Sequence, residues 1–248
     1  MLDVRDLSVT YGDGTVGIKN LSLHLDPGEK CALIGANGAG KTSLLQALVG
    51  VLPSEGQVTA AGVNLSKKTL PELRQRVGLV MQNPDDQLFL PTIARDVAFG
   101  PENLGQDHDT VRHKTRAILE QLGIAHLAER SALRLSGGEK RMAALAAVLV
   151  MDPDLLLLDE PTAFLDPRAR RRLMEVLTAL PQTMLIATHD LGFALEVCPE
   201  TVLLRQGCVY AQGQSRELLF HDGLMDAAGV ESLPVFSGLR RPEVTDVR

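Results

Sequence analysis

The amino-acid sequence predicts an α/β fold in which a largely parallel sheet forms the core, with an antiparallel β subdomain beside it and a helical subdomain inserted into it. Three short apolar runs support this prediction: "KCALIG" (30–35), "DLLLLDE" (154–160) and "TMLIAT" (183–188). Each is followed by a segment with helical periodicity, such as "KTSLLQALVGV" (41–51) after the first. Strands that alternate with helices are typical of parallel sheets whose faces are covered by helices.

The segments around this core have other patterns. Residues 4–30 alternate apolar and polar positions between Gly and Pro-Gly breaks, which predicts antiparallel strands and turns. Residues 91–151 are rich in Leu and Ala and are mostly helical in pattern. We expect one domain over 1–218, with its core at about 1–83 and 152–218, a helical subdomain at about 84–151, and a carboxyl-terminal extension at 219–248. The end of the extension lacks apolar residues and is expected to fray; its support of a dimer is a hypothesis.

The composition limits the classes of function. The net charge is −6 and only 3% of the 248 residues are aromatic, whereas nucleic-acid binders usually carry a basic stripe or stacking aromatics. Three scattered cysteines favour a reducing compartment with ordinary buried thiols. The first residues are charged and lack an apolar signal core, and the longest apolar run, Met142–Met151, is about half the ~20 residues that a bilayer requires. We therefore expect a cytosolic chain that binds no nucleic acid.

A glycine-rich stretch, "GANGAGKT" (35–42), fits the phosphate-loop pattern G-x-x-x-x-G-K-[ST] between a predicted strand and a predicted helix. Its glycines let backbone N–H groups surround phosphate oxygens, and the helix that follows points its positive dipole end at the same charge. Lys41 is expected to reach the β- and γ-phosphates, and the Thr42 hydroxyl to bind Mg²⁺. A glycine-rich turn with a chance lysine is disfavoured because both flanks fit. The predicted core is therefore that of a P-loop NTPase (RecA-like).

Acidic and histidine side chains follow the other two buried strands. Asp159 and Glu160 end the strand "LLLLDE", and His189 follows "TMLIAT". Asp159 is expected to hold Mg²⁺, Glu160 to orient or deprotonate the attacking water, and His189 to contact the γ-phosphate. Acids also end strands simply by meeting solvent, and a histidine there can cap a turn; the phosphate loop upstream favours the functional interpretation.

Two glycines occupy the first turn of the predicted helix in "LRLSGGEKRMAALAAVLV" (133–150). Ser136 and Glu139 have the spacing of an ordinary capping box. Capping does not require Gly137 and Gly138, each of which costs about 1 kcal/mol relative to alanine inside a helix. Open N–H groups at a helix start suit an anion such as a terminal phosphate. A second phosphate-seeking segment suggests that a nucleotide is shared with another subunit.

Taken together, over about residues 1–215, these motifs resemble the nucleotide-binding subunits of ATP-binding-cassette transporters. The matching segments are the Walker A loop "GANGAGKT", the Walker B strand "LLLLDE", the signature "LSGGEK" (135–140), the D-loop "AFLD" (163–166) and the switch-histidine segment "ATHD" (187–190). The resemblance implies an ATPase with ATP and Mg²⁺ as cofactors. It implies nucleotide contacts from Tyr11, which stacks on adenine in this family, and from Gly35, Ala36, Asn37, Gly38, Ala39, Gly40, Lys41, Thr42, Ser43, Gln82, Ser136, Gly137, Gly138, Asp166 and His189. It assigns catalysis to Glu160, His189, Gln82 and Lys41, and Mg²⁺ to Thr42, Gln82 and Asp159.

The stretch "MQNPDDQLFLPTIARDVAFGPENLG" (81–105) resembles energy-coupling-factor importers, most closely the cobalt/nickel type. In that family this region forms a groove for coupling helices of a transmembrane partner that carry arginine. Asp85 and Asp86 would offer carboxylates to an arginine, with Phe89 as part of an apolar floor. Alternatively, the two acids merely start a helix, where they favour the dipole. The resemblance implies a peripheral protein on the cytoplasmic face of the inner membrane, working with coupling and substrate-binding subunits.

Alternatives and departures from the family pattern remain. Glu139 stands where glutamine is commoner, and Phe164 where the D-loop often has glycine. One complete motif set favours a homodimer, and pairing with a related ATPase stays open. Import of a vitamin such as biotin is the nearest rival, and a soluble cassette ATPase acting on nucleic acid or ribosomes is the second. The arginines at 168 and 170–172 are predicted to form a solvated helix face or, as the alternative, to contact anionic lipid or an acidic partner.

Overall fold

The computed structural model describes residues 1–234. Its strands are β1 (Leu2–Thr10), β2 (Val16–Leu25), β3 (Lys30–Ile34), β4 (Glu55–Ala60), β5 (Val63–Asn64), β6 (Val77–Val80), β7 (Leu155–Asp159), β8 (Thr183–Ala187), β9 (Glu200–Arg205) and β10 (Cys208–Gln214). Its helices are α1 (Lys41–Leu48), α2 (Leu70–Arg76), α3 (Ile93–Asn103), α4 (His108–Gln121), α5 (Gly137–Leu149), α6 (Pro167–Ala179), α7 (Leu191–Val197), α8 (Ser215–Leu218) and α9 (Asp222–Ala227), with short 3₁₀ turns at Pro84–Asp86, Ala125–Leu127 and Ala132–Arg134.

The core sheet has six strands in the order β10-β9-β3-β8-β7-β6. The neighbours from β9 to β6 all pair in parallel, and only the edge strand β10 is antiparallel. The three apolar runs of the sequence are β3, β7 and β8, which lie side by side at its centre. The parallel α/β core predicted from them is confirmed.

Apolar residues fill both faces of this sheet, since side chains alternate along a strand. Leu155 and Leu157 of β7 belong to one buried cluster, and Leu156 and Leu158 belong to the other. This double burial explains why β7 is a continuous run of leucines instead of an alternating pattern. Because β3, β8 and β7 run parallel, their carboxyl ends lie at the same edge of this sheet.

A second, four-stranded sheet with the order β2-β1-β4-β5 packs against one of these clusters. All its neighbours are antiparallel, which confirms the antiparallel subdomain predicted from residues 4–30. β4 and β5 complete this sheet. Its β2 leads directly into β3, which ends at the glycine-rich loop.

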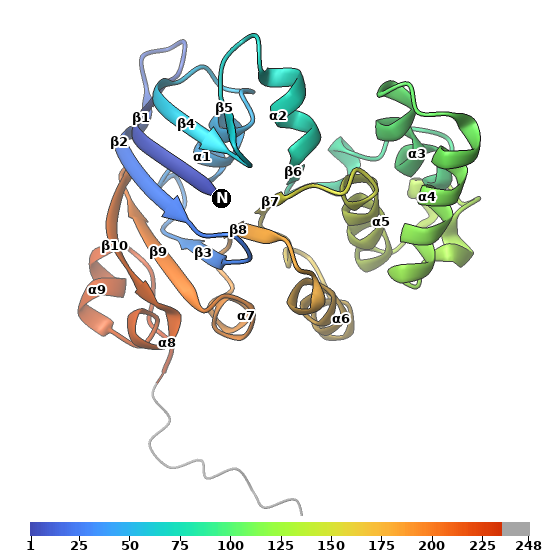
Figure 1. The fold of residues 1–248 in the computed structure, drawn as a ribbon. Coiled ribbons are helices and arrows are strands. Elements are labelled where there is room, and N and C mark those ends of the chain that lie inside the picture. The colour runs from blue at the N-terminus through green and yellow to red at the C-terminus, as the bar shows by residue number, and fades with distance from the viewer. Residues whose placement is uncertain (235–248) are drawn as a thin grey trace, which may run out of the picture.

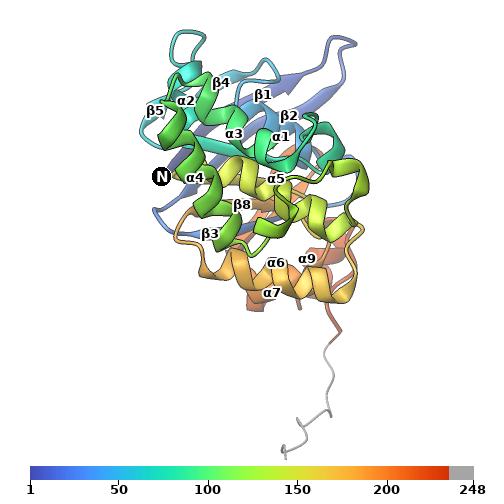
Figure 2. The ribbon, with the colours of Figure 1, turned by 90° about the vertical axis from the view of Figure 1, so that its right-hand side faces the viewer.

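The helices α3, α4 and α5 lie between β6 and β7 in the chain and form a group beside the two sheets (Figure 1). In Figure 2, which looks onto this group, α4 and α5 lie above α6 and α7. The apolar side of α5, including Leu145 and Ala146, joins the cluster that covers β7 and β8. The helical insertion is therefore packed on the core, and its exact limits at 84 and 151 stay a prediction.

The carboxyl-terminal extension begins as a packed segment. Leu219 and Met225, before and within α9, are fully buried in the core cluster. Gly229 follows α9, and a Cβ atom added there would lie 3.2 Å from the Cβ of Ala36 in the glycine-rich loop. The dimer hypothesis for this extension stays a prediction, and its expected frayed end lies outside the described residues. Within residues 1–234 no helix is both long and apolar enough to cross a bilayer.

Candidate nucleotide site

The glycine-rich loop joins β3 to α1 and requires glycine where its backbone turns. Gly40 has φ +106° and precedes the first residue of α1. A Cβ atom there would collide with the carbonyl oxygen of Gly17 and lie 2.8 Å from Ile18 Cδ1. Gly38 also has a left-handed φ, +80°. Such positive φ values are strained for residues other than glycine, so Gly38 and Gly40 are needed for the shape of the loop itself.

Lys41 lies inside this loop. Its Nζ donates hydrogen bonds to the carbonyl oxygens of Gly35 at 2.7 Å and Ala36 at 3.3 Å, and the residue is only 7% exposed. Burial lowers the pKa of Lys41, while the charges of Glu160 and Asp159 raise it. The structure thus directs the predicted phosphate-binding amine into the loop.

Thr42 and Asp159, the residues predicted to bind Mg²⁺ together, are in contact. The Thr42 hydroxyl donates to Asp159 Oδ2 at 2.8 Å, although the residues are far apart in the chain. Within the described residues, Asp159 Oδ1 is buried and has no hydrogen-bond partner. Burial raises the pKa of this carboxyl against the opposing effects of Thr42, Lys41 and Arg141. A carboxylate oxygen without a partner beside a hydroxyl is a donor set that suits Mg²⁺.

Glu160 and His189 form a pair at the ends of β7 and β8. Glu160 Oε2 lies 2.7 Å from His189 Nδ1 and accepts the His189 backbone N–H at 3.2 Å. The Glu160 side chain is 9% exposed and that of His189 is 68% exposed. Glu160 has φ +44°, an unusual backbone for a non-glycine residue. The two predicted catalytic side chains are thus brought together, with the histidine outermost.

Tyr11 stands at the start of the turn between β1 and β2. Its hydroxyl lies 2.6 Å from the Ser43 hydroxyl on α1, and the residue is 38% exposed. The predicted adenine-stacking aromatic is therefore anchored to the helix that begins at the phosphate loop. Ala36, Asn37 and Ala39, the other loop residues predicted to contact nucleotide, lie within the same turn.

Gln82 lies near the start of residues 81–90, which we call the Q-loop segment. The residue is exposed, and its side chain makes no hydrogen bond within the described residues. Its backbone carbonyl accepts a hydrogen bond from Arg141 of α5 at 2.6 Å. Sequence reasoning missed Arg141, because an arginine in a Leu- and Ala-rich helix carries no signal of burial.

Ser136, Gly137 and Gly138 start α5 as predicted, with no hydrogen bond to the glycine-rich loop of the same chain among residues 1–234. Ser136 and Glu139 form a full capping box. Gly138 has a packing reason that the sequence did not reveal, because a Cβ atom there would lie 2.6 Å from the Cβ of Ala169. Gly137 has no such clash, since the nearest atom would be 3.6 Å away. Only the first glycine is left without a packing explanation.

The D-loop residue Asp166 caps α6. Its Oδ1 accepts the backbone N–H groups of Arg168 at 2.8 Å and Ala169 at 3.0 Å. Phe164, one of the departures from the family pattern, is 94% exposed and has φ +61°. Asp166 therefore has a local structural role, and its predicted nucleotide contact stays a prediction.

Asp85 and Asp86, the acids of the predicted partner groove, are both exposed, and within residues 1–234 only Asp85 forms an ion pair. Asp85 Oδ1 accepts a hydrogen bond from Lys140 Nζ at 2.6 Å, so this carboxylate already has a cationic partner. Both acids lie in the 3₁₀ turn Pro84–Asp86, as the helix-start alternative expects. Phe89 is 62% exposed, and its ring packs edge-to-face on Phe99 at 5.2 Å between centroids.

One of the clustered arginines, Arg170, departs from the predicted solvated face. Arg170 donates two hydrogen bonds to Asp190, Nε to Oδ2 at 2.6 Å and Nη2 to Oδ1 at 2.8 Å. Arg172 Nη2 donates to the carbonyl oxygen of Leu122 at 2.7 Å. Arg170 is half-buried, whereas Arg171 and Arg172 are exposed.

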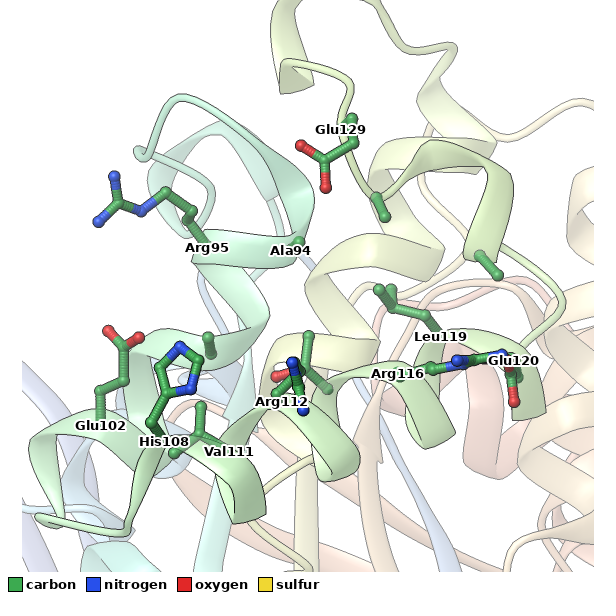
Figure 3. Close-up of a pocket in the computed structure, with 14 residues that line it drawn as sticks. Ala94, Arg95, Glu102, His108, Val111, Arg112, Arg116, Leu119, Glu120 and Glu129 are labelled. Atoms are coloured by element: carbon green, nitrogen blue, oxygen red, sulfur yellow. Dashed lines mark hydrogen bonds and ion pairs between the residues drawn. The ribbon is translucent and has the colours of Figure 1, made fainter.

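A cavity of about 500 Å³ lies between α3, α4 and the residues near 125–129. Figure 3 shows Arg95 and Glu102 coming from α3, and His108 and Arg112 from α4. The Thr115 hydroxyl at this cavity is buried and has no partner within the described residues. None of the predicted nucleotide residues lines the cavity, so it is separate from the candidate site.

Comparison with known proteins agrees with this geometry. A family model for the ABC transporter matches residues 18–163. The chain belongs to the ABC transporter family. A relative from Gloeobacter violaceus, provisionally named an ABC transporter ATP-binding protein, is 48% identical and covers 96% of this chain and 98% of its own. The energy-coupling factor transporter ATP-binding protein EcfA of Methanothermobacter thermautotrophicus is 41% identical over 88% of this chain and 72% of its own.

A solved structure has the same fold as this ABC protein. It is cbiO1 from Clostridium perfringens, described as part of the ABC transporter complex cbiONQ. The TM-score is 0.79 at 34% identity, with 92% of this chain and 94% of that chain covered. The P-loop NTPase fold predicted from the sequence is confirmed, and so is the enzyme class: this ABC protein binds ATP and is an ATPase.

Proposed function

We propose that this ABC protein is the ATP-hydrolysing subunit of an energy-coupling-factor type importer, that it forms a dimer around two ATP molecules, and that it drives uptake of cobalt or nickel through a separate membrane complex. The observation that carries the ATPase part is the convergence of Lys41, Thr42, Asp159, Glu160 and His189 at the carboxyl ends of β3, β7 and β8. Similarity to EcfA and to cbiO1 supports the importer type.

ATP binding begins at the glycine-rich loop. The backbone N–H groups and Lys41 would surround the β- and γ-phosphates, and Tyr11 would stack on the adenine. The contacts of Lys41 Nζ with the Gly35 and Ala36 carbonyls hold the amine where phosphate oxygens can replace those carbonyls as acceptors. Such an exchange keeps the buried cation paired throughout binding.

Mg²⁺ would be held by Thr42, Asp159 and Gln82. The first two are already in contact. The buried Asp159 Oδ1 makes no hydrogen bond among residues 1–234, so this oxygen is available to coordinate a cation. Mg²⁺ bound to ATP neutralises charge that develops on the phosphate oxygens during transfer. Gln82 has to reach this place from the neighbouring β6, so its position depends on the backbone of the Q-loop segment.

Glu160 would orient the attacking water and accept its proton. Its Oε2 is occupied by the two contacts with His189, so we assign the proton to Oε1, which makes no hydrogen bond among residues 1–234. His189 fixes the carboxylate and is exposed enough to contact the γ-phosphate at the same time. This arrangement matches a general base that is held by a second group.

Two copies are needed for a complete site. Ser136, Gly137 and Gly138 make no hydrogen bond to the glycine-rich loop of their own chain among the described residues, so the phosphate they would meet belongs to a second chain. One chain carries a full motif set, which supports a homodimer, with a related ATPase as the other candidate partner. Asp166 would contribute to the same interface.

The membrane partner would dock at the groove near Asp85, Asp86 and Phe89. Asp86 makes no ion pair within the described residues, whereas Asp85 is paired with Lys140. An arginine of a coupling helix would therefore meet Asp86 first and compete with Lys140 for Asp85. The exposed Phe89 ring, supported by Phe99, offers apolar contact. In this proposal the protein binds peripherally to its membrane partner, on the cytoplasmic face of the inner membrane.

The experiment that tests this function is uptake of labelled cobalt, nickel and biotin in cells that carry either the wild-type protein or Glu160→Gln. Loss of uptake of one metal supports the proposal and identifies the cargo. If only biotin uptake falls in the Glu160→Gln cells, the importer proposal stands and the proposed metal cargo is refuted. Unchanged uptake of all three refutes import of these cargoes. Retained ATP hydrolysis by purified Glu160→Gln would refute the role of Glu160.

A further inference from the structure

Arg141 is the largest fully buried side chain in the described protein, and it is 1% exposed. Its guanidinium does not hydrogen-bond to any carboxylate within residues 1–234. Instead Nη1 donates to the carbonyl oxygen of Met81 and Nη2 to that of Gln82, each at 2.6 Å. Its Nε has no partner among the described residues. A planar guanidinium thus holds two successive backbone carbonyls at the start of the Q-loop segment.

Packing alone gives no reason for this residue. Burying a cation costs several kcal/mol unless it is paired, and the other buried positions of α5 are all Met, Leu or Ala. Burial lowers the pKa of Arg141 and the charge of Asp159 partly opposes this, which leaves the pKa at about 10. Arg141 therefore lies within electrostatic range of the predicted Mg²⁺ ligand as well as at the Gln82 backbone.

The Q-loop segment has further contacts with α5. Lys140 Nζ donates to Asp85 Oδ1, and Gln87 Nε2 donates to the carbonyl oxygen of Ala144 at 2.8 Å. At the far end of the segment, Asp96 Oδ1 accepts the backbone N–H groups of Phe89 and Leu90 at 2.9 Å each. The segment is thus tied to the helical group along its length, while the Gln82 side chain itself has no hydrogen bond within the described residues.

We infer that Arg141 is a positioning residue for the ATPase reaction: it fixes the backbone at Met81 and Gln82 so that the Gln82 side chain reaches Mg²⁺ and the γ-phosphate. Because Arg141 lies on α5, the position of Gln82 depends on the orientation of this helix, which Ser136 caps. The inference rests on the proposed role of Gln82 and goes beyond it by naming what holds Gln82 in place.

The test uses the purified full chain and its variants Arg141→Met, Arg141→Lys, Gln82→Ala and the double variant Gln82→Ala/Arg141→Met. Arg74→Met is the matched control, because Arg74 also donates to two backbone carbonyls, those of Val49 and Gly50, away from the site. The measurements are kcat, KM for ATP, the Mg²⁺ concentration for half-maximal activity, ATP binding in EDTA, and thermal unfolding.

We expect Arg141→Met to lower kcat roughly 10- to 100-fold, since a misplacement of about 1 Å can cost 10²-fold. The Mg²⁺ concentration for half-maximal activity should rise several-fold, whereas ATP binding in EDTA should stay within about twofold, because Lys41 and its loop are untouched. Arg141→Lys should be intermediate, because an ammonium reaches one carbonyl at a time. In the Gln82→Ala background, Arg141→Met should cost no more than about a further twofold.

Two results would overturn the inference: multiplicative losses in the double variant, or a loss in Arg74→Met as large as in Arg141→Met. If Arg141→Met does not fold, Arg141→Lys carries the test, and wild-type kcat and Mg²⁺ dependence in that folded variant would count against the inference. Wild-type turnover in Gln82→Ala would instead refute the proposed role of Gln82. If Gln82→Ala lowers turnover and Arg141→Met does not, the inference about Arg141 is refuted while the proposed role of Gln82 stands.

Discussion

Replacing Arg170 with methionine removes a two-bond ion pair beside His189, the predicted catalytic histidine. Arg170 holds both oxygens of Asp190, and Asp190 directly follows His189 in the chain. Asp190 Oδ1 also accepts the backbone N–H of Phe193 at 2.9 Å and so caps α7. The substitution keeps Asp190 as the cap of α7 but removes the positive charge that pairs with it.

The magnitude follows from how far the pair is buried. The side chains of Arg170 and Asp190 are 29% and 22% exposed. Exposed pairs contribute about 0.2–1 kcal/mol, and breaking a fully buried pair costs about 3–5 kcal/mol. A partly buried, two-bond pair lies between these limits, so we expect the free energy of unfolding to fall by about 2 kcal/mol. For a chain of this size that lowers the melting temperature by roughly 4–8 °C.

The assay is thermal unfolding of the Arg170→Met protein, with Arg171→Met as the control that removes the same charge from an exposed position of α6. Burial alone raises the pKa of Asp190, but the hydrogen bonds from Arg170 and Phe193 leave it below its ordinary 3.8. The pair's contribution is therefore complete above that pH and is lost as the pH falls through the folded-state pKa. Equal melting temperatures of the two variants at pH 7 would refute this reasoning.

Three further changes have defined outcomes. Lys41→Ala should weaken ATP binding at least about tenfold, because charge-assisted bonds to phosphate are lost; a dissociation constant within twofold of the wild type would contradict this. Gly138→Ala should lower the free energy of unfolding by about 1–3 kcal/mol through overpacking against Ala169, whereas Gly137→Ala should not lower it; equal melting temperatures would disprove the packing role. Asp85→Ala with Asp86→Ala should leave ATP binding intact but weaken co-purification of the membrane partner, and unchanged assembly would remove the groove proposal.

The sequence predicted the parallel core and the glycine-rich loop well, because each is encoded by a pattern within a short segment. Leu155–Leu158 forms a run too apolar for a solvated strand, and Gly38 and Gly40 occupy positions whose φ values require glycine. These patterns are local, so they are visible without the fold. The meeting of Thr42 with Asp159 could be predicted as well, because the carboxyl ends of the parallel strands of one sheet share one edge.

The contacts of Arg170, Arg141 and Gly138 could not be predicted, because they depend on which side of a helix faces the rest of the protein. Arg170 and Arg171 are neighbours in one arginine run, yet only Arg170 meets an acid, because α7 lies against one side of α6. Arg141 bonds to backbone carbonyls, which every residue has, so no partner could be found in the sequence. Gly138 looked like an anion-binding residue until the position of Ala169 gave it a packing reason.

Buried charge identifies the site more directly than any single motif does. The charged residues that are buried in the described protein are Lys41, Asp96, Arg141, Asp159 and Glu160. Asp96 holds the Q-loop segment, and the other four surround the predicted phosphate and Mg²⁺ positions. Burying these charges opposes folding unless they are paired, and Asp159 Oδ1 still lacks a partner within residues 1–234. The two buried cations, Lys41 and Arg141, balance the two buried anions, Asp159 and Glu160, so these four side chains carry little net charge before ATP and Mg²⁺ bind.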